Sequence, residues 1–296
     1  MTDSRIYIAD GAMLDLAKRK FDAYIRIDRG IEPPVEGEMN MPGNGVYLSP
    51  DEFEQYLATR KPLGVRISFD TQQELDYLIQ QLRPYVTSLY LHAKHNRAFD
   101  LTPLQTCSQL ESVQFYWNNK QETLWDIRKN TKLKHFELMD YNKVSDFSVF
   151  RGSSIETLRL FGCNACSSFV SKLHIDDPTF LIDMPKLKYL YLDIVKDESS
   201  EYYLKLLEKC KNLQTLSFPA KFFTFQQFAW LKAHLPNVTT GLECIYYSGD
   251  FVTIIGRRMP GLLYDKNRAE KYQKRYDALV IKYRNRETPP TDDEKD

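Results

Sequence analysis

LESVQFYWN, which begins at Leu110, is the clearest copy of a phrase that recurs along the chain. In this phrase an apolar residue is followed by a second one three positions later, and by a third two positions after that. Two upstream stretches, VTSLYL and GVRISF, follow the same pattern. The remaining copies are LKHFELMDYN from Leu133, IETLRLFGCN from Ile155, LKYLYLDIV from Leu187 and LQTLSFPA from Leu213. This self-similarity predicts a fold of stacked, similar units.

The spacing of the copies indicates the size of one unit. We mark each copy by its central apolar residue, which gives Ile67, Leu89, Val113, Phe136, Leu158, Leu190 and Leu216. Successive markers are 22, 24, 23, 22, 32 and 26 residues apart. A period of about 20–29 residues is typical of a solenoid whose units each contain one strand and one helix or turn. The interval of 32 predicts an insertion, which we place at residues 167–180.

The phrases DLTPLQTCSQLESVQF (100–115) and DIRKNTKLKHFEL (126–138) resemble the leucine-rich repeat family, in particular its irregular bacterial members. The resemblance covers residues 64–262. It implies an α/β solenoid of about seven or eight repeats, with parallel strands on the concave face and helices or irregular turns on the convex face. The family usually has Asn or Cys three residues after the last strand leucine. Asn118 and Cys163 fit this rule, whereas Lys94, Tyr141, Val195 and Lys221 do not.

Both ends of the repeat region are expected to carry caps, because a bare solenoid end exposes an unpaired strand and apolar core. Residues 1–63 lack the phrase and are predicted to form the N-terminal cap. A capping box at Ser49–Glu52 predicts a helix there. Residues 263–287 are predicted to form a C-terminal capping helix, and the polar residues 288–296 a disordered tail.

Composition argues against several classes of protein. Lys plus Arg and Asp plus Glu both number 40, so the chain has no basic excess and we expect no nucleic-acid partner. No stretch approaches the ~20 apolar residues of a membrane span, so we expect no membrane association. The five cysteines have no dense, regular spacing, and the first residues show no signal-peptide pattern. These features predict a cytoplasmic protein with free thiols.

Two groups of residues could in principle carry chemistry. Cys163 and Cys166 form a C-x-x-C pair, which is weak evidence for redox or zinc chemistry without a second pair. His92, His95 and His135 lie near predicted strands, but no metal-binding motif contains them. No glycine-rich phosphate loop or nucleophile motif is present. We therefore expect no cofactor, no metal and no catalysis, with an enzyme or enzyme subunit that has its site in residues 1–63 as the alternative.

The C-terminal helix leaves a further alternative open. Residues 265–287 hold eight Lys or Arg against four Asp or Glu. A basic amphipathic helix can lie on an anionic membrane or in a partner's groove. Its apolar side is rich in tyrosine and it follows the last repeat directly, so we favour the capping role.

Side chains that alternate with the buried leucines are predicted to point outward from the concave face, because strand side chains alternate between faces. These positions contain many aromatic residues and no lysine, which is typical of a protein-binding hot spot. We therefore predict a non-catalytic protein–protein interaction module that binds a partner through this face. The candidate binding residues are Tyr90, His92, Gln114, Tyr116, Glu137, Met139, Arg159, Phe161, Tyr189, Tyr191 and Asp193.

Overall fold

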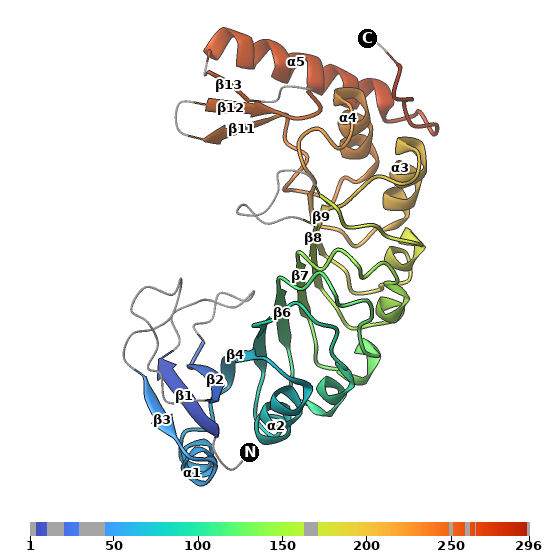
Figure 1. Cartoon of the computed structure of the whole chain (residues 1–296). Helices are drawn as coiled ribbons and strands as arrows, with labels where there is room; N and C mark the ends of the chain where they lie inside the picture. The colour runs from blue at the N-terminus through green and yellow to red at the C-terminus, as the bar shows by residue number, and fades with distance from the viewer. Residues whose placement is uncertain are drawn as a thin grey trace.

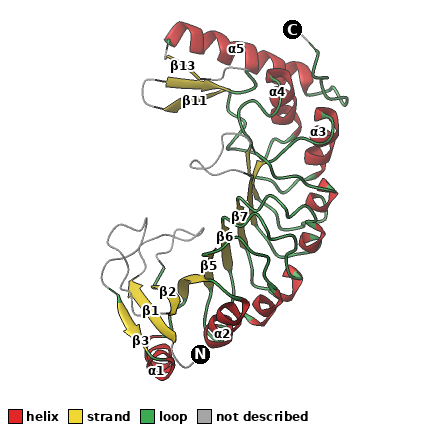
Figure 2. Ribbon diagram, viewed as in Figure 1, coloured by secondary structure: helices red, strands yellow, loops and turns green. Residues whose placement is uncertain are grey.

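The computed structural model describes residues 4–10, 21–29, 45–162, 171–248, 251–257, 261–263 and 265–294. The chain forms an arc whose inner side carries a large sheet and whose outer side carries helices and short turns (Figure 1). Figure 2 shows the same division, with strands inside and helices outside. The predicted α/β class is confirmed by this open, mostly parallel sheet of ten strands.

Strands follow one another across the sheet almost in chain order. From the C-terminal edge they are β10 (Thr215–Ser217), β9 (Tyr189–Asp193), β8 (Thr157–Phe161), β7 (His135–Met139), β6 (Ser112–Tyr116), β5 (Ser88–Ala93), β4 (Gly64–Phe69), β2 (Ala23–Arg29), β1 (Ser4–Asp10) and β3 (Val46–Leu48). Strands β4–β10 are parallel, and β2 joins them in parallel beside β4. At the N-terminal edge, β1 runs antiparallel to both of its neighbours, β2 and β3. Each parallel pair therefore needs a connection that crosses on the outer side of the arc.

One continuous core lies between the sheet and the outer connections. Its central row consists of directly paired, fully buried residues: Val65, Leu89, Val113, Phe136, Leu158, Leu190 and Leu216. The marker Ile67 is thus wrong by two residues, because Val65 is the residue that pairs with Leu89. A shift of two preserves the alternation of faces, so the same side chains are buried. Truncating one of these leucines to alanine costs about 2–5 kcal/mol.

Outer connections are of two kinds. Helices α2 (Gln72–Leu82), α3 (Ser200–Lys209) and α4 (Phe225–His234) all begin at side-chain caps. Helices α2 and α3 bury one face, whereas α4 is buried on all sides from Phe225 to Leu231. The middle units have only short 3-10 turns: η1 (Thr102–Thr106), η2 (Ile127–Lys129), η3 (Ser148–Phe150) and η4 (Pro178–Leu181). Each turn contributes buried apolar residues to the core, such as Leu104, Ile127, Phe150 and Leu181.

Buried polar side chains bind the backbone of these turns. Asn130 donates from Nδ2 to the carbonyls of Leu104 at 2.9 Å and Cys107 at 3.0 Å. Its Oδ1 accepts from the indole of Trp125 at 2.7 Å. One side chain therefore satisfies three buried polar groups from two consecutive units.

The N-terminal strands extend the sheet beyond the repeats. They are β1, β2 and β3, which all lie before residue 49 in the chain. The capping box is confirmed, since Ser49 and Glu52 exchange hydrogen bonds at the start of α1 (Pro50–Arg60).

A close backbone approach covers the other edge of the sheet. The amide of Leu216 in β10 donates to the carbonyl of Thr240 at 3.0 Å. The next residue, Gly241, has φ of 101°, and a Cβ atom there would lie 1.6 Å from the carbonyl oxygen of Leu216. Only glycine lets the chain cross the edge this closely.

A smaller antiparallel sheet follows, formed by β11 (Ile245–Ser248), β12 (Phe251–Ile254) and β13 (Gly261–Leu263). Helix α5 (Lys266–Tyr283) then packs against α4 (Figure 1). Its buried residues are Ala269, Tyr276, Leu279 and Tyr283, which confirms the predicted apolar face. In the described part of the chain, no helix has the length and apolar character needed to span a bilayer.

The predicted disorder of residues 288–296 is wrong for residues 288–294. Pro289 and Pro290 are buried, and the carbonyl of Pro290 accepts from Gln227 Nε2 at 3.0 Å. Composition misses this contact because its partner lies 63 positions earlier in the chain. Residues 163–170, which contain Cys163, Cys166 and the start of the predicted insertion, lie outside the described residues.

Candidate functional site

We use the name concave face for the side chains of β4–β10 that point to the inner side of the arc. Because these strands are in register, the side chains form columns across the sheet. One column runs through Arg66, Tyr90, Gln114, Glu137, Arg159, Tyr191 and Ser217. A second runs through Ser68, His92, Tyr116, Met139, Phe161 and Asp193. Neighbours in a column lie about 4.8 Å apart, so each side chain contacts the next.

The predicted binding residues differ in accessibility. Tyr90, Gln114 and Glu137 are only 6–7 % exposed, so their side chains lie beneath the accessible surface of the concave face. The other eight are half-buried and open to a partner: His92, Tyr116, Met139, Arg159, Phe161, Tyr189, Tyr191 and Asp193. The accessible part of the face therefore centres on β6–β9.

Arg159 is held by contacts with three side chains of this region. Its guanidinium lies 2.9 Å from the carboxylate of Glu137. It also lies over the rings of Phe161, at 5.2 Å, and Tyr191, at 5.1 Å. Gln114 Nε2 donates to Glu137 Oε1 at 3.1 Å, which fixes the carboxylate from the other side. The guanidinium is thus held between a carboxylate and two aromatic rings in the free chain.

Beside the predicted residues lies a second stack of arginines and tyrosines. Arg66 lies 5.0 Å from the ring of Tyr90 and 5.4 Å from that of Tyr24 on β2. Arg26 lies 4.9 Å from the ring of Tyr7 on β1. Burial is the main cause that raises the pKa of both Tyr24 and Tyr90, so both rings carry neutral phenols at neutral pH.

Sequence reasoning missed Arg66 as a member of the concave face, and it missed Tyr24 and Arg26 as neighbours of this face on β2. The alternation of Val65, Ile67 and Phe69 was a usable signal for Arg66, because it places the residue between them on the opposite side. No sequence signal shows that β2 pairs with β4, so Tyr24 and Arg26 could not be placed.

His92 occupies the middle of the second column. Its Nδ1 and the hydroxyl of Ser68 form a hydrogen bond of 3.2 Å, and its ring lies 5.9 Å from that of Tyr116. Burial, followed by the nearby charges of Arg66 and Lys94, lowers the pKa of His92 to about 4. The imidazole is therefore neutral at pH 7 and acts as an uncharged hydrogen-bonding ring.

No family model and no curated protein sequence matches the chain.

The remaining histidines have separate partners. His95 lies 3.5 Å from Asp70, and the ring of His135 forms a hydrogen bond of 3.0 Å with Thr157. Across the residues that the structure describes, no group of three or more His, Cys, Asp or Glu is placed to hold a metal ion. The described thiols, Cys107, Cys210 and Cys244, are buried and unpaired, and burial raises their pKa values to about 12. At neutral pH these thiols are protonated and poorly nucleophilic.

The accessible concave face thus offers aromatic rings, one thioether, one fixed guanidinium and one carboxylate. Aromatic rings contribute large contact area at low entropic cost, and a pre-ordered arginine binds carboxylates or carbonyls without further loss of rotamer freedom. This combination supplies apolar contact area together with fixed hydrogen-bonding groups.

Proposed function

We propose that this chain is a leucine-rich-repeat-type solenoid that acts as a non-catalytic protein-interaction module and binds a partner protein through the concave face. The observation that carries the proposal is the pair of half-buried rings of Phe161 and Tyr191 at the fixed Arg159, with the half-buried Tyr116 two strands away on the same face. The recurring unit and the in-register parallel strands support the repeat architecture.

Protein is the partner that this chemistry favours. Tyrosine and arginine are the residues most enriched in the energetic centres of protein interfaces. Six strands spaced by about 4.8 Å give a surface roughly 24 Å long, which can hold an extended segment or a helix of a partner. A nucleic-acid groove needs accessible lysines and arginines along its length, and the column residues from β5 to β10 include only Arg159.

The buried, unpaired Cys107, Cys210 and Cys244 are in keeping with action in a reducing compartment, which we propose to be the cytoplasm. The alternative function, an enzyme site in residues 1–63, would use the polar cluster of Tyr7, Tyr24, Tyr47 and Arg26. A ligand or metal bound near these residues would favour it.

Matched alanine variants test the proposal. Tagged wild-type chain captures its partner from lysate, and the same capture is repeated with Tyr116→Ala, Phe161→Ala and Tyr191→Ala. Each change should weaken binding by about 2 kcal/mol or more, roughly thirtyfold, without loss of folding. Tyr202→Ala on α3 is the control, because this tyrosine is 37 % exposed on the outer side of the arc. Equal capture by all four variants would refute the assignment of the binding surface.

A further inference from the structure

The C-terminal segment Arg284–Glu294 lies against α3 and α4, where buried polar side chains bind it. Three of them are fully buried: Ser200, Gln227 and Trp230 are each 0 % exposed. The indole of Trp230 donates to the carbonyl of Arg286 at 2.9 Å. Lys205 donates to the carbonyl of Glu287. We name these four residues, together with Lys196, the α3–α4 groove. The groove therefore presents a row of hydrogen-bond donors to one extended segment.

Gln227 is oriented for this purpose by its own helix. Its Oε1 accepts from the amide of Thr224 at 2.9 Å, as part of the capping box of α4. The amide group therefore points both of its N–H bonds towards the C-terminal segment. One N–H donates to the carbonyl of Pro290 and the other to Asp292 Oδ1, each at 3.0 Å. A buried glutamine whose oxygen and both N–H groups are hydrogen-bonded in this way binds specifically to one carbonyl and one carboxylate.

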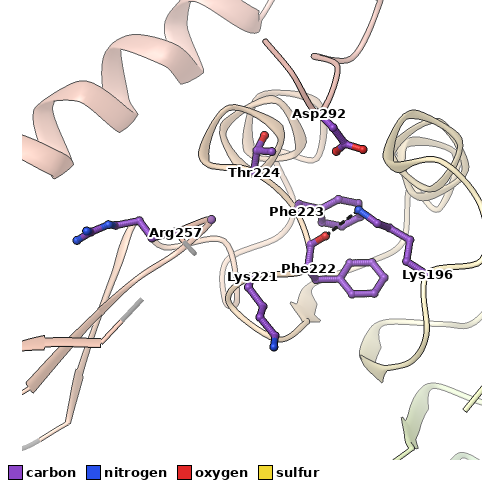
Figure 3. A pocket seen from close by; sticks show the side chains of 8 residues that line it. Lys196, Lys221, Phe222, Phe223, Thr224, Arg257 and Asp292 are labelled. Carbon is purple, nitrogen blue, oxygen red and sulfur yellow. Dashed lines mark hydrogen bonds between the residues drawn. The ribbon is translucent and has the colours of Figure 1, made fainter. Parts of the chain in front are cut away.

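The carboxylate of Asp292 sits at the N-terminal end of α4. Besides Gln227, it accepts from the hydroxyl of Ser200 at 2.6 Å, and Lys196 donates to that hydroxyl at 2.5 Å. The positive end of the helix and the lysine both favour a negative charge here. Figure 3 shows Asp292 above Phe223, with the amino group of Lys196 just below the carboxylate in this view.

Proline residues are well accommodated by a groove that offers only hydrogen-bond donors. Pro289 and Pro290 are buried in it, and proline has no amide N–H that would need an acceptor. Their fixed φ angles also reduce the entropy lost when an extended segment is bound. The groove is therefore complementary to a segment with two consecutive prolines and a carboxylate two residues after the second proline.

Next to Asp292 the groove continues into a cavity of about 350 Å³. Phe222 and Phe223 form part of its wall, and Lys196, Lys221 and Arg257 line it too. Figure 3 shows the side chains of Lys221 and Arg257 pointing away from Asp292. Residues 284–294, the described part of the segment, leave this space open, so a longer acidic segment has room to enter it and pair with these cations.

We propose that the α3–α4 groove is a second recognition site, separate from the concave face, for a partner protein that presents an extended Pro-Pro-x-Asp segment followed by acidic residues. The chain's own C-terminal segment occupies this site as an internal ligand, and the partner's segment displaces it. The contacts depend on carbonyls and one carboxylate in residues 286–292, beyond the end of α5, so a separate peptide makes the same contacts.

Full-length variants and a fluorescent peptide of the sequence RETPPTDDE, which covers residues 286–294, test this proposal by fluorescence anisotropy. Asp292→Ala releases the internal segment and leaves the groove intact, so the peptide should bind this variant at least tenfold more tightly than it binds wild type. Gln227→Glu keeps the capping acceptor that Thr224 needs, but it removes both N–H donors and adds a negative charge. This variant should release the internal segment and fail to bind the peptide.

Trypsin cleavage after Arg286 reports release directly, and cleavage should become faster in both variants. Asp293→Ala is the control: it changes the adjacent, exposed aspartate and should alter neither cleavage nor peptide binding. Peptide binding that is no tighter to Asp292→Ala than to wild type, or equally tight to Gln227→Glu, would overturn the proposal. A wild-type dimer that dissociates in Asp292→Ala would assign the groove to the tail of a second copy instead.

Discussion

Arg159 and Glu137 occupy the same position on neighbouring strands of the concave face, and their side chains form an ion pair of 2.9 Å. The two ends of this pair differ in exposure, since the side chain of Glu137 is 8 % exposed and that of Arg159 is 35 % exposed. The arginine therefore has a double role: it neutralises a buried acid and presents a charge to the inner side of the arc.

This relationship predicts a coupled effect on stability. Arg159→Ala leaves a buried carboxylate with one neutral donor, Gln114, and should lower the free energy of unfolding by about 2 kcal/mol. Adding Glu137→Gln removes the charge that needed the arginine, so the double variant should be more stable than the sum of the single effects predicts. Urea denaturation of the four proteins gives the coupling energy, for which we expect about 1 kcal/mol or more. Strictly additive effects would show that the pair is not coupled.

The neutral state of His92 predicts a pH dependence. Its pKa is lowered to about 4 in the folded chain, whereas an unfolded histidine titrates near pH 6.5. Between these values the unfolded state binds more protons, so stability should fall as pH drops from about 6.5 to about 4. His92→Asn should flatten this part of the curve of melting temperature against pH. The exposed His95 provides the matched control, and an identical pH curve for wild type and His92→Asn would contradict the account.

The hydrogen bonds of Asn130 predict how much the contact between consecutive units contributes to stability. Asn130→Ala leaves the carbonyls of Leu104 and Cys107 and the indole of Trp125 without their partner. Since each unsatisfied buried group costs about 1–3 kcal/mol, we expect a loss of roughly 3 kcal/mol in chemical denaturation. The exposed Asn212, which donates to the carbonyl of Pro185, is the control, and Asn212→Ala should cost less than about 1 kcal/mol. Similar losses for both variants would argue against the bridging role of Asn130.

Helix α5 is predicted to unfold together with the sheet. The hydroxyl of the buried Tyr276 lies 3.1 Å from the carbonyl of Phe228 and 2.9 Å from that of Leu242. Tyr276→Phe should therefore lower the global stability by about 1–2 kcal/mol, whereas Tyr202→Phe at an exposed site should change it by less than about 0.5 kcal/mol. A global unfolding curve that Tyr276→Phe leaves unchanged would mean that α5 is an independent appendage.

The period of two along each strand and the recurring leucines were sufficient to predict the strands β4–β10 and, for β5–β9, the side chains of their inner face. Accessibility was harder to predict. Alternation places Tyr90, Gln114 and Glu137 on the correct side of the sheet, but their burial depends on neighbours in adjacent strands and on Arg66.

Contacts between distant segments explain the remaining differences. The pairing of β2 with β4 and the docking of Pro290 on Gln227 join residues that no local pattern connects. The polar composition of the C-terminal segment favours disorder in isolation, and buried donors on α3 and α4 reverse that preference.

Site-specific photocrosslinking from the concave face tests the central claim most directly. A photoreactive benzophenone amino acid replaces Phe161 in one protein and Tyr202 in another, and each is irradiated in native lysate. We predict that the photoreactive group at position 161 gives one discrete crosslinked partner, and that this product is lost when Tyr191→Ala is added. The group at position 202 should give no crosslinked partner. Crosslinking of the same partner from position 202 but not from position 161 would contradict this prediction.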